Sequence, residues 1–217
     1  IGCAVAYELG RRGAAVRVID GRDVGRGATQ ASAGMLAPFL EAEHPGPLRG
    51  LGVRSLELYD QFVADVVADS GDGVLYERTG TLEVATDETA LRRLERARQG
   101  LASVGVDCRL LGREEAHEAE PHLAAAVRGA LLVPSQGYVA AAALTAALCR
   151  AGVRHGVSFV PSCTVRRLSA GGGGIEIDTT AGPLTSDIVV LAAGSWAGRV
   201  EVDGEAPLPV RPVRGQL

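Results

Sequence analysis

The chain has 217 residues, of which 47% are apolar, enough to build the core of one large domain or two small ones. Its 22 basic and 26 acidic side chains give a formal net charge of -4, so neither nucleic acid nor an anionic membrane surface is an expected partner. The longest apolar run, 139–149, is well short of the roughly 20 residues that span a bilayer, so we expect no membrane segment.

The first part of the chain predicts a helix, a strand and a long loop. Apolar residues at every fourth position predict a helix over 1–12, and Gly13 follows as its C-cap. The β-branched segment 15–20 predicts a strand that ends in an acidic residue. The next segment, 21–38, is rich in small and polar residues, which predicts a loop.

The middle of the chain alternates helices with short strands. Periodic apolar residues predict helices at 51–67 and 88–104, and Asp87 would cap the second one. Between them, 74–85 predicts two short strands around a Thr-Gly turn. The elements expected next are a strand at 108–111, an irregular acidic segment at 114–121, a strand at 128–134 and an alanine-rich helix at 139–151.

The last part of the chain predicts strands only. They are expected at 157–161, 164–169, 175–180 and 187–193, with the glycines at 171–174 as a hairpin turn. The strand at 187–193 is apolar almost throughout, which is typical of a strand covered on both faces.

The cysteines and histidines do not indicate a metal site. Four residues of each type are scattered without a CxxC motif or a pair of histidines on one helix face. Cys3 and Cys149 fall within apolar helical patterns, where a free thiol behaves as a small hydrophobic side chain. We therefore expect no metal, and a reducing cytoplasm suits these cysteines best.

The start of the chain has the spacing of a dinucleotide-binding unit. In a Rossmann-type unit, the third glycine of the phosphate loop begins a helix, and an acid about 20 residues later binds the ribose. Gly2 and Asp20 hold these positions, and the first strand with the other two glycines would precede Ile1. A terminal residue without a role remains the alternative for Gly2, and a turn-forming residue for Asp20.

The order of the predicted elements distinguishes FAD from NAD. An NAD-binding domain would continue from the second strand into another helix and a third parallel strand. Here a loop and a long stretch of other structure come before the late strands. The nucleotide domain is therefore split in sequence, which favours FAD as the cofactor.

Five segments carry a family resemblance over essentially the whole chain. They are GRGATQASAGMLAP (25–38), RTGTLEVA (78–85), PSCTVRRL (161–168), VVLAAGSWAG (189–198) and PVRGQL (212–217). In this order they resemble the successive signatures of glycine oxidases of the thiamine-pathway type, within the D-amino acid oxidase family. The resemblance implies a chain that is truncated at both ends.

The resemblance also implies the fold and its division into domains. The fold would be α/β, with a Rossmann-like FAD-binding domain that is split in sequence and an inserted, partial α+β substrate domain. The FAD-binding domain would comprise 1–73 and 139–200, and the substrate or cap portion 74–138 and 201–217.

Small residues dominate the contacts that the resemblance implies for FAD, and such residues let backbone N–H groups approach a bulky anionic cofactor. No catalytic residue is assigned, and Gly194, Ser195 and Trp196 form a second rank of candidates. The implied contacts are Ile1 and Gly2 at the pyrophosphate, Asp20 and Gly21 near the adenosine ribose, Ala28 and Thr29 on the pyrophosphate side, Ala33, Gly34 and Met35 along the isoalloxazine, and Val165 at the adenine.

The implied reaction is oxidative deamination of glycine or another small amino acid. A hydride would pass from Cα to flavin N5, with oxygen as the acceptor, giving an imine and hydrogen peroxide. A sarcosine oxidase or D-amino acid dehydrogenase relative and a catalytically silent nucleotide-binding fragment remain alternatives, and a homo-oligomer stays open. The arginine that binds the substrate carboxylate should follow Leu217, so Arg211 and Arg214 are not assigned to it, and we expect these 217 residues alone to be inactive.

Overall fold

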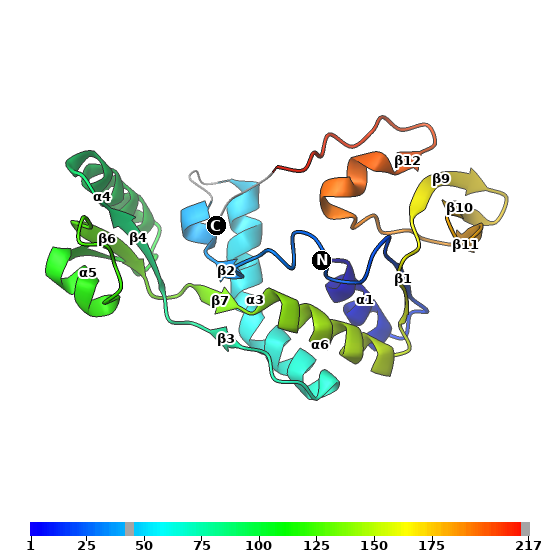
Figure 1. Cartoon of the computed structure of the whole chain (residues 1–217), viewed down its shortest axis with the longest axis horizontal. Helices are drawn as coiled ribbons and strands as arrows, with labels where there is room; N and C mark the ends of the chain where they lie inside the picture. The colour runs from blue at the N-terminus through cyan, green and yellow to red at the C-terminus, as the bar shows by residue number, and fades with distance from the viewer. Residues whose placement is uncertain (42–45, 214–217) are drawn as a thin grey trace. The chain divides into compact units, whose positions relative to one another are not determined.

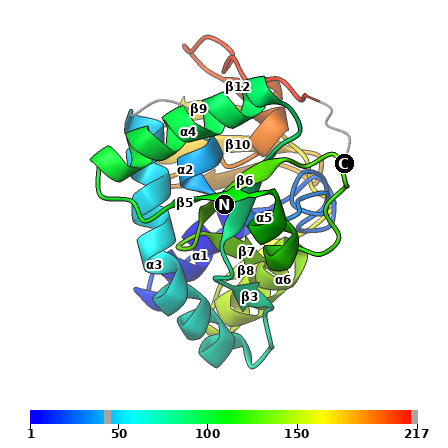
Figure 2. The same ribbon diagram turned by 90° about the vertical axis from the view of Figure 1, so that its left-hand side faces the viewer.

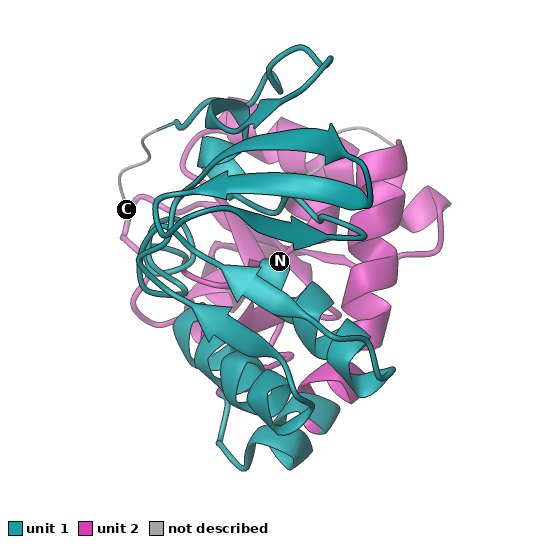
Figure 3. Ribbon diagram, turned by 90° about the vertical axis from the view of Figure 1, so that its right-hand side faces the viewer, with its two compact units in different colours: residues 1–32, 65–74, 141–217 teal, residues 33–64, 75–140 magenta. Residues whose placement is uncertain are grey.

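The structure, a computed structural model, describes residues 1–41 and 46–213 (Figure 1, Figure 2). Arg214 therefore lies outside the described residues. The chain divides into two compact units (Figure 3): the first comprises Ile1–Ser32, Asp65–Val74 and Ala141–Leu217, and the second Ala33–Ala64 and Leu75–Ala140. These units are defined by compactness and not by what they bind, so the predicted division into FAD-binding and substrate domains stays a prediction.

The first unit contains two helix–strand pairs from distant parts of the chain. Helix α1 (Gly2–Arg11) leads to β1 (Arg17–Ile19), and α6 (Ala141–Arg154) leads to β8 (Ser158–Val160). Strands β1 and β8 pair in parallel. Parallel strands that each follow a packed helix are the repeating unit of Rossmann-like folds, so the predicted α/β class is confirmed.

Helices α1 and α6 pack against each other through small side chains (Figure 1). Ala6 on α1 and both Ala147 and Ala151 on α6 are buried. A Cβ at Gly10 would lie 2.8 Å from Cγ2 of Val157, just before β8. Glycine is therefore required at position 10, because even a methyl group would separate α1 from the residues that lead into β8.

A polar cluster in the first unit connects the middle of α1 with the end of α3 (Pro47–Ser70) and the residue that follows α6. The fully buried Tyr7 donates its hydroxyl to Oδ2 of Asp69 at 2.7 Å, and Nε2 of His155 lies 2.8 Å from the same oxygen. Asp69 belongs to the last turn of α3. The hydrogen bonds from His155 and then Tyr7 hold the pKa of Asp69 below its usual range, whereas burial raises the pKa of Tyr7.

The second sheet of the first unit has the strand order β11-β10-β9-β12. Strands β9 and β10 form an antiparallel hairpin that closes at the predicted glycine turn, with Gly171 opposite Gly174. Strand β11 extends the antiparallel arrangement, and β12 runs parallel to β9. The bounds are β9 (Val165–Gly171), β10 (Gly174–Thr179), β11 (Leu184–Ser186) and β12 (Glu201–Val202).

The predicted strand at 187–193 is wrong for the structure. The segment makes no ladder with any described strand, and a 3-10 helix, η1 (Gly194–Arg199), follows it. Ile188 is 77% exposed and Val190 is 57% exposed, so the segment is not covered on both faces. An apolar pattern identifies a segment that can enter a sheet, but a strand exists only where a neighbour supplies backbone hydrogen bonds.

The second unit contains two antiparallel three-stranded sheets, ordered β2-β7-β3 and β4-β6-β5. Helix α4 packs against β4 and β6, and α5 packs against β6 (Figure 2). The strands are β2 (Met35–Leu36), β3 (Tyr76–Glu77), β4 (Thr81–Ala85), β5 (Arg109–Gly112), β6 (Gly129–Val133) and β7 (Gly137–Val139), and the helices are α2 (Pro38–Glu41), α4 (Glu88–Ser103) and α5 (Arg113–Ala119).

Several details of the second unit differ from the sequence expectations. The acidic segment 114–121 is mostly the helix α5, whose start is fixed by a 2.8 Å hydrogen bond from Gly112 N–H to Oε2 of Glu115. Strands β3 and β4 do not pair with each other, because each bonds to a different sheet. Strands β2 and β7 were not expected, since two or three residues are too few to show a periodicity.

The core of the second unit lies between α4 and the β4-β6-β5 sheet. Leu94 and Leu101 on α4 are buried against Leu131 and Val133 on β6. The predicted cap is confirmed, because Oδ1 of Asp87 accepts a hydrogen bond from Ala90 N at 2.8 Å. Burying each leucine contributes about 1.5–3 kcal/mol, and these residues hold the helix on the sheet.

A buried glutamine connects three separate segments of the second unit. Gln136 is 0% exposed, and its Nε2 donates to Oγ1 of Thr81 at 2.6 Å. Its Oε1 accepts from the backbone N–H of Phe39 at 3.1 Å. Because an unpaired polar group costs about 1–3 kcal/mol when buried, both ends of this side chain need their partners.

Replacing Tyr7 with phenylalanine tests the polar cluster. Tyr7→Phe removes one hydrogen bond to a carboxylate and should lower the free energy of unfolding by about 1–2 kcal/mol near neutral pH. Denaturant titration of the whole protein, followed by circular dichroism, measures this change.

The effect of Tyr7→Phe should depend on pH in one direction. The pKa of Asp69 is lowered in the fold from 3.8, so its contribution is complete above that value and is lost as the pH falls through the folded pKa. The difference between Tyr7→Phe and the parent should therefore shrink in acid. A difference that stays constant from neutral pH into acid would contradict this account.

Candidate functional site

The start of α1 offers backbone donors to an anion. The first N–H groups of a helix have no acceptor within the helix, and the aligned peptide dipoles make this end positive. Ile1 is the N-cap residue, and its apolar side chain makes no capping hydrogen bond to these groups. The first turn also carries no acidic residue. Such donors are suited to the pyrophosphate that the resemblance implies near Ile1 and Gly2, and this contact stays a prediction.

Asp20 and Gly21 follow β1 and lie beside the start of β9. The carbonyl oxygen of Asp20 accepts a hydrogen bond from Cys163 N at 2.9 Å. A Cβ at Gly21 would lie 3.0 Å from Oγ1 of Thr164, the residue before Val165. The structure thus brings three predicted cofactor residues, Asp20, Gly21 and Val165, to one end of the β1 and β9 segments.

The Asp20 carboxylate has a local structural role as well. Its Oδ1 accepts a hydrogen bond from Arg22 N at 3.0 Å, which is an Asx-type turn. Such a turn uses one oxygen and leaves the second as an acceptor for a ribose hydroxyl. The turn-forming role and the ribose-binding role are therefore compatible in Asp20.

The residues around Ala28 and Thr29 form a series of turns over 21–31. Trp196 packs against this segment: the Arg22 guanidinium lies 4.1 Å from its ring centroid. A Cβ at Gly27 would lie 3.0 Å from the same ring, so the segment approaches Trp196 closely. In the structure, the second-rank candidate Trp196 is thus a packing residue for the segment that carries Ala28 and Thr29.

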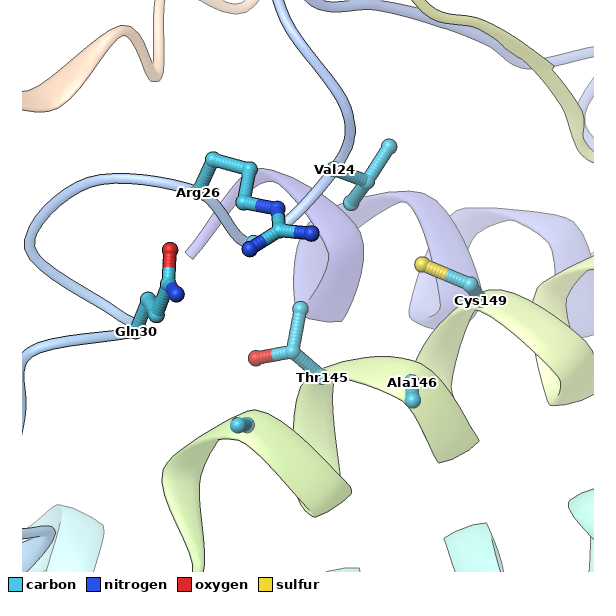
Figure 4. A pocket seen from close by; sticks show the side chains of 8 residues that line it. Val24, Arg26, Gln30, Thr145, Ala146 and Cys149 are labelled. Atoms are coloured by element: carbon cyan, nitrogen blue, oxygen red, sulfur yellow. The ribbon is translucent and has the colours of Figure 1, made fainter.

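A pocket of about 310 Å³ lies between this segment and α6 (Figure 4). The close-up shows Arg26 and Gln30 on the segment facing Thr145 on α6. Sequence analysis missed this pocket, because its two walls are far apart in the chain and no spacing rule connects them. The lining residues are Val24, Gly25, Arg26, Gln30, Ala142, Thr145, Ala146 and Cys149.

The residues predicted along the isoalloxazine, Ala33, Gly34 and Met35, belong to the second unit, whereas the other predicted FAD contacts belong to the first. Gly34 has a φ of 76°, and its carbonyl accepts from Val139 N at 3.0 Å. A Cβ at Gly34 would overlap the carbonyl oxygen of Val139. Met35 is 56% exposed, so its thioether is free of the core. Gly34 is therefore required by the fold, and Met35 is not.

The described part of the chain offers neither a metal-binding cluster nor a membrane-spanning helix. No group of three or more His, Cys, Asp or Glu residues within 1–41 and 46–213 is arranged to hold a metal ion; His44 lies outside that part. No helix in the described part of the chain is long and apolar enough to cross a membrane.

The parallel β1–β8 pair with its packed helices places the chain in the class of α/β proteins with a Rossmann-like unit, which is typical of dinucleotide binding. The DAO family, described as FAD dependent oxidoreductase, matches residues 1–217. The chain belongs to this family. The match confirms the predicted family, and with it FAD as the cofactor of that family.

Similar proteins of known name narrow the class. The glycine oxidase of Geobacillus kaustophilus (strain HTA426) is 32% identical over 217 residues, which is 100% of this chain and 58% of that protein. A crystal structure of glycine oxidase from Geobacillus kaustophilus superposes with a TM-score of 0.88 over 92% of this chain and 54% of that one. The glycine oxidase of Bacillus cereus ATCC 14579 is 26% identical, with a TM-score of 0.85 over 92% of this chain and 54% of that one.

A relative with a different name shares the same fold. The crystal structure of L-proline dehydrogenase from P. horikoshii is 25% identical, with a TM-score of 0.74 over 90% of this chain and 50% of that one. The chain thus spans between 50% and 58% of the length of these named relatives.

Substitution of Gly34 separates its role in the fold from its predicted role at the cofactor. Gly34→Ala should lower the free energy of unfolding by at least about 1–3 kcal/mol, because a positive φ alone costs that much for a side chain. Gly50→Ala is the matched control, since a Cβ there meets nothing within 4 Å. Denaturant unfolding without flavin measures both variants, and equal stability for them would show that Gly34 is not required by the fold.

Proposed function

We propose that the protein containing this chain is an FAD-dependent oxidase that deaminates glycine or another small amino acid. The observation that carries the proposal is the likeness to glycine oxidase over the whole chain. The exposed donors at the start of α1 and the acid at the end of β1 support it, because they suit the pyrophosphate and the ribose of one cofactor.

The chemistry and the binding are divided between cofactor and protein. When bound, FAD supplies the hydride acceptor for the substrate Cα and passes the electrons to oxygen, which yields an imine and hydrogen peroxide. The backbone N–H groups of Ile1 and Gly2 would offset the pyrophosphate charge, and Asp20 would accept from a ribose hydroxyl. Gly21, Ala28 and Thr29 would allow close backbone approach, the backbone of Val165 would contact adenine, and Ala33, Gly34 and Met35 would lie along the flavin ring.

The protein needs few acid–base groups for this reaction, because it mainly orients the substrate. We assign no catalytic residue within the 217 residues. The arginine that would bind the substrate carboxylate is expected outside these 217 residues, in a region that corresponds to the additional length of the relatives.

Three alternatives to this oxidase remain: an enzyme with another electron acceptor, an enzyme with another substrate, and a nucleotide-binding protein without catalytic activity. The likeness to L-proline dehydrogenase supports a D-amino acid dehydrogenase type of enzyme, in which a compound other than oxygen takes the electrons. A sarcosine oxidase relative would act on a methylated amine, and a silent nucleotide-binding protein would show no turnover. The free cysteines support a reducing cytoplasm as the compartment, and assembly into a homo-oligomer is compatible with all three.

Asp20 provides a test of the cofactor assignment. In the whole protein, Asp20→Ala should weaken FAD binding by about 1–3 kcal/mol, the range for a hydrogen bond to a charged group. Asp20→Asn keeps an acceptor for Arg22 N–H, so it separates loss of the turn from loss of the charge. Asp23→Ala, three residues further along, is the exposed control. Flavin fluorescence titration gives the affinities, and equal affinity for Asp20→Ala and the parent would remove Asp20 from the site.

The reaction itself is tested with the whole protein. It should be yellow, and adding glycine or a small D-amino acid should release hydrogen peroxide in step with oxygen consumption. If the amino acid is oxidised when a dye is the electron acceptor but not when oxygen is, the protein is a dehydrogenase and not an oxidase. A colourless protein that does not take up FAD would leave the silent nucleotide-binding protein.

A further inference from the structure

Two cysteines from distant parts of the chain meet in the first unit. Cys3 lies in the first turn of α1, and Cys149 lies on α6. Their sulfur atoms are 3.7 Å apart, and the Cys149 thiol donates to the sulfur of Cys3. The helix packing described above creates this contact, because it sets the first turn of α1 against α6.

The pair is connected to solvent through the pocket beside α6. Cys3 is buried, but Cys149 is half-buried and lines the pocket of about 310 Å³ (Figure 4). A small uncharged oxidant could enter a space of this size. The other two cysteines lack this combination: Cys163 is buried, and Cys108 donates to the carbonyl oxygen of Arg98.

We propose that Cys3 and Cys149 form a reversible thiol–disulfide pair that hydrogen peroxide oxidises. Sulfur atoms in van der Waals contact need to approach by less than about 2 Å to reach the disulfide bond length. The start of a helix favours a thiolate, which is the reactive form of a cysteine. The proposal thus assigns a modification site to two residues that the cofactor site does not use.

The hydrogen bond between the two thiols shifts their pKa values in opposite directions. Because Cys149 donates to it, the pKa of Cys3 is lowered, although burial of Cys3 and, to a smaller extent, the nearby Asp20 oppose this effect. The same bond raises the pKa of Cys149, with burial adding to the rise and Arg150 opposing it. The contact therefore favours one thiolate within the pair, and the second sulfur lies beside it to resolve the oxidised form.

The reaction is balanced by one peroxide. One thiolate of the pair attacks an oxygen of hydrogen peroxide, the O–O bond breaks, and a sulfenic acid forms with release of hydroxide. The sulfur of the other cysteine then attacks the sulfenic sulfur, loses its proton and displaces the oxygen as water. The hydroxide takes up the proton that the first thiol released. In total, two thiols and one peroxide give one disulfide and two waters.

The proposed oxidase would itself produce the oxidant, but the inference depends on the sulfur contact and not on that activity. The test therefore uses added hydrogen peroxide and no amino acid. Failure of the oxidase proposal would leave this test unaffected, and failure of this test would leave the oxidase proposal standing.

The experiment maps disulfides in the whole protein. The reduced protein is treated with hydrogen peroxide, its remaining thiols are alkylated, and the digest is analysed by mass spectrometry. We expect a linked pair of peptides that contains Cys3 and Cys149 and is about 2 Da lighter than the sum of its reduced parts. Dithiothreitol should reverse the link.

Variants make the assignment specific. Cys108→Ser should still form the link, whereas Cys3→Ser and Cys149→Ser should not, with circular dichroism showing that each variant is folded. If a serine variant does not fold, the proposal is decided by the parent protein alone, according to which cysteine peptides are linked after peroxide treatment. The proposal is overturned if peroxide yields no link between Cys3 and Cys149, or links either one to Cys108, Cys163 or another chain.

Discussion

The close packing of α1 on α6 is the contact on which the first unit depends. It requires small residues, because Ala6 and Ala151 are buried in it and a side chain at Gly10 would strike Val157. Each helix leads into a strand, so fixing the helices also fixes β1 beside β8. The positive start of α1, the acid that follows β1 and the sulfur contact between α1 and α6 all derive their positions from this one interface. Adding or removing a single methyl group in this interface would therefore shift the positions of all three features, although they do not contact one another directly.

Elements with a strong repeating pattern or an explicit cap could be predicted from the sequence. The helix that Asp87 caps and the hairpin at the glycine run both lie where the pattern placed them. The wrong strand predictions have a common physical origin: the sequence of one segment does not show which other segment will supply its backbone hydrogen bonds. The apolar segment 187–193 lacks a ladder among the described strands, and β3 and β4 bond to separate sheets although they are adjacent in the chain. Propensity alone cannot specify such pairings.

The candidate site was only partly accessible to sequence reasoning. Spacing connected Gly2 with Asp20, the order of the predicted elements favoured FAD, and the family resemblance supplied the other implied contacts. The structure adds what distant segments contribute: Cys163 and Thr164 hold the chain around Asp20, and Val139 explains why position 34 must be glycine. Gly34 illustrates a general difficulty, since a residue that resembles a cofactor contact can be needed first for packing. Exposed residues such as Met35 are cleaner probes of the flavin.

The parallel pairing of β1 with β8 joins residues about 140 positions apart, from Arg17 to Ser158. During synthesis at about 5–20 residues per second, β8 leaves the ribosome on the order of 10 s after β1. Helix α1 must wait for the same time until α6 arrives to cover Ala6 and Tyr7. The intervening second unit has its own buried core and can fold within that interval. Its folding would shorten the distance between the waiting strands, so the second unit would also help the first unit to close.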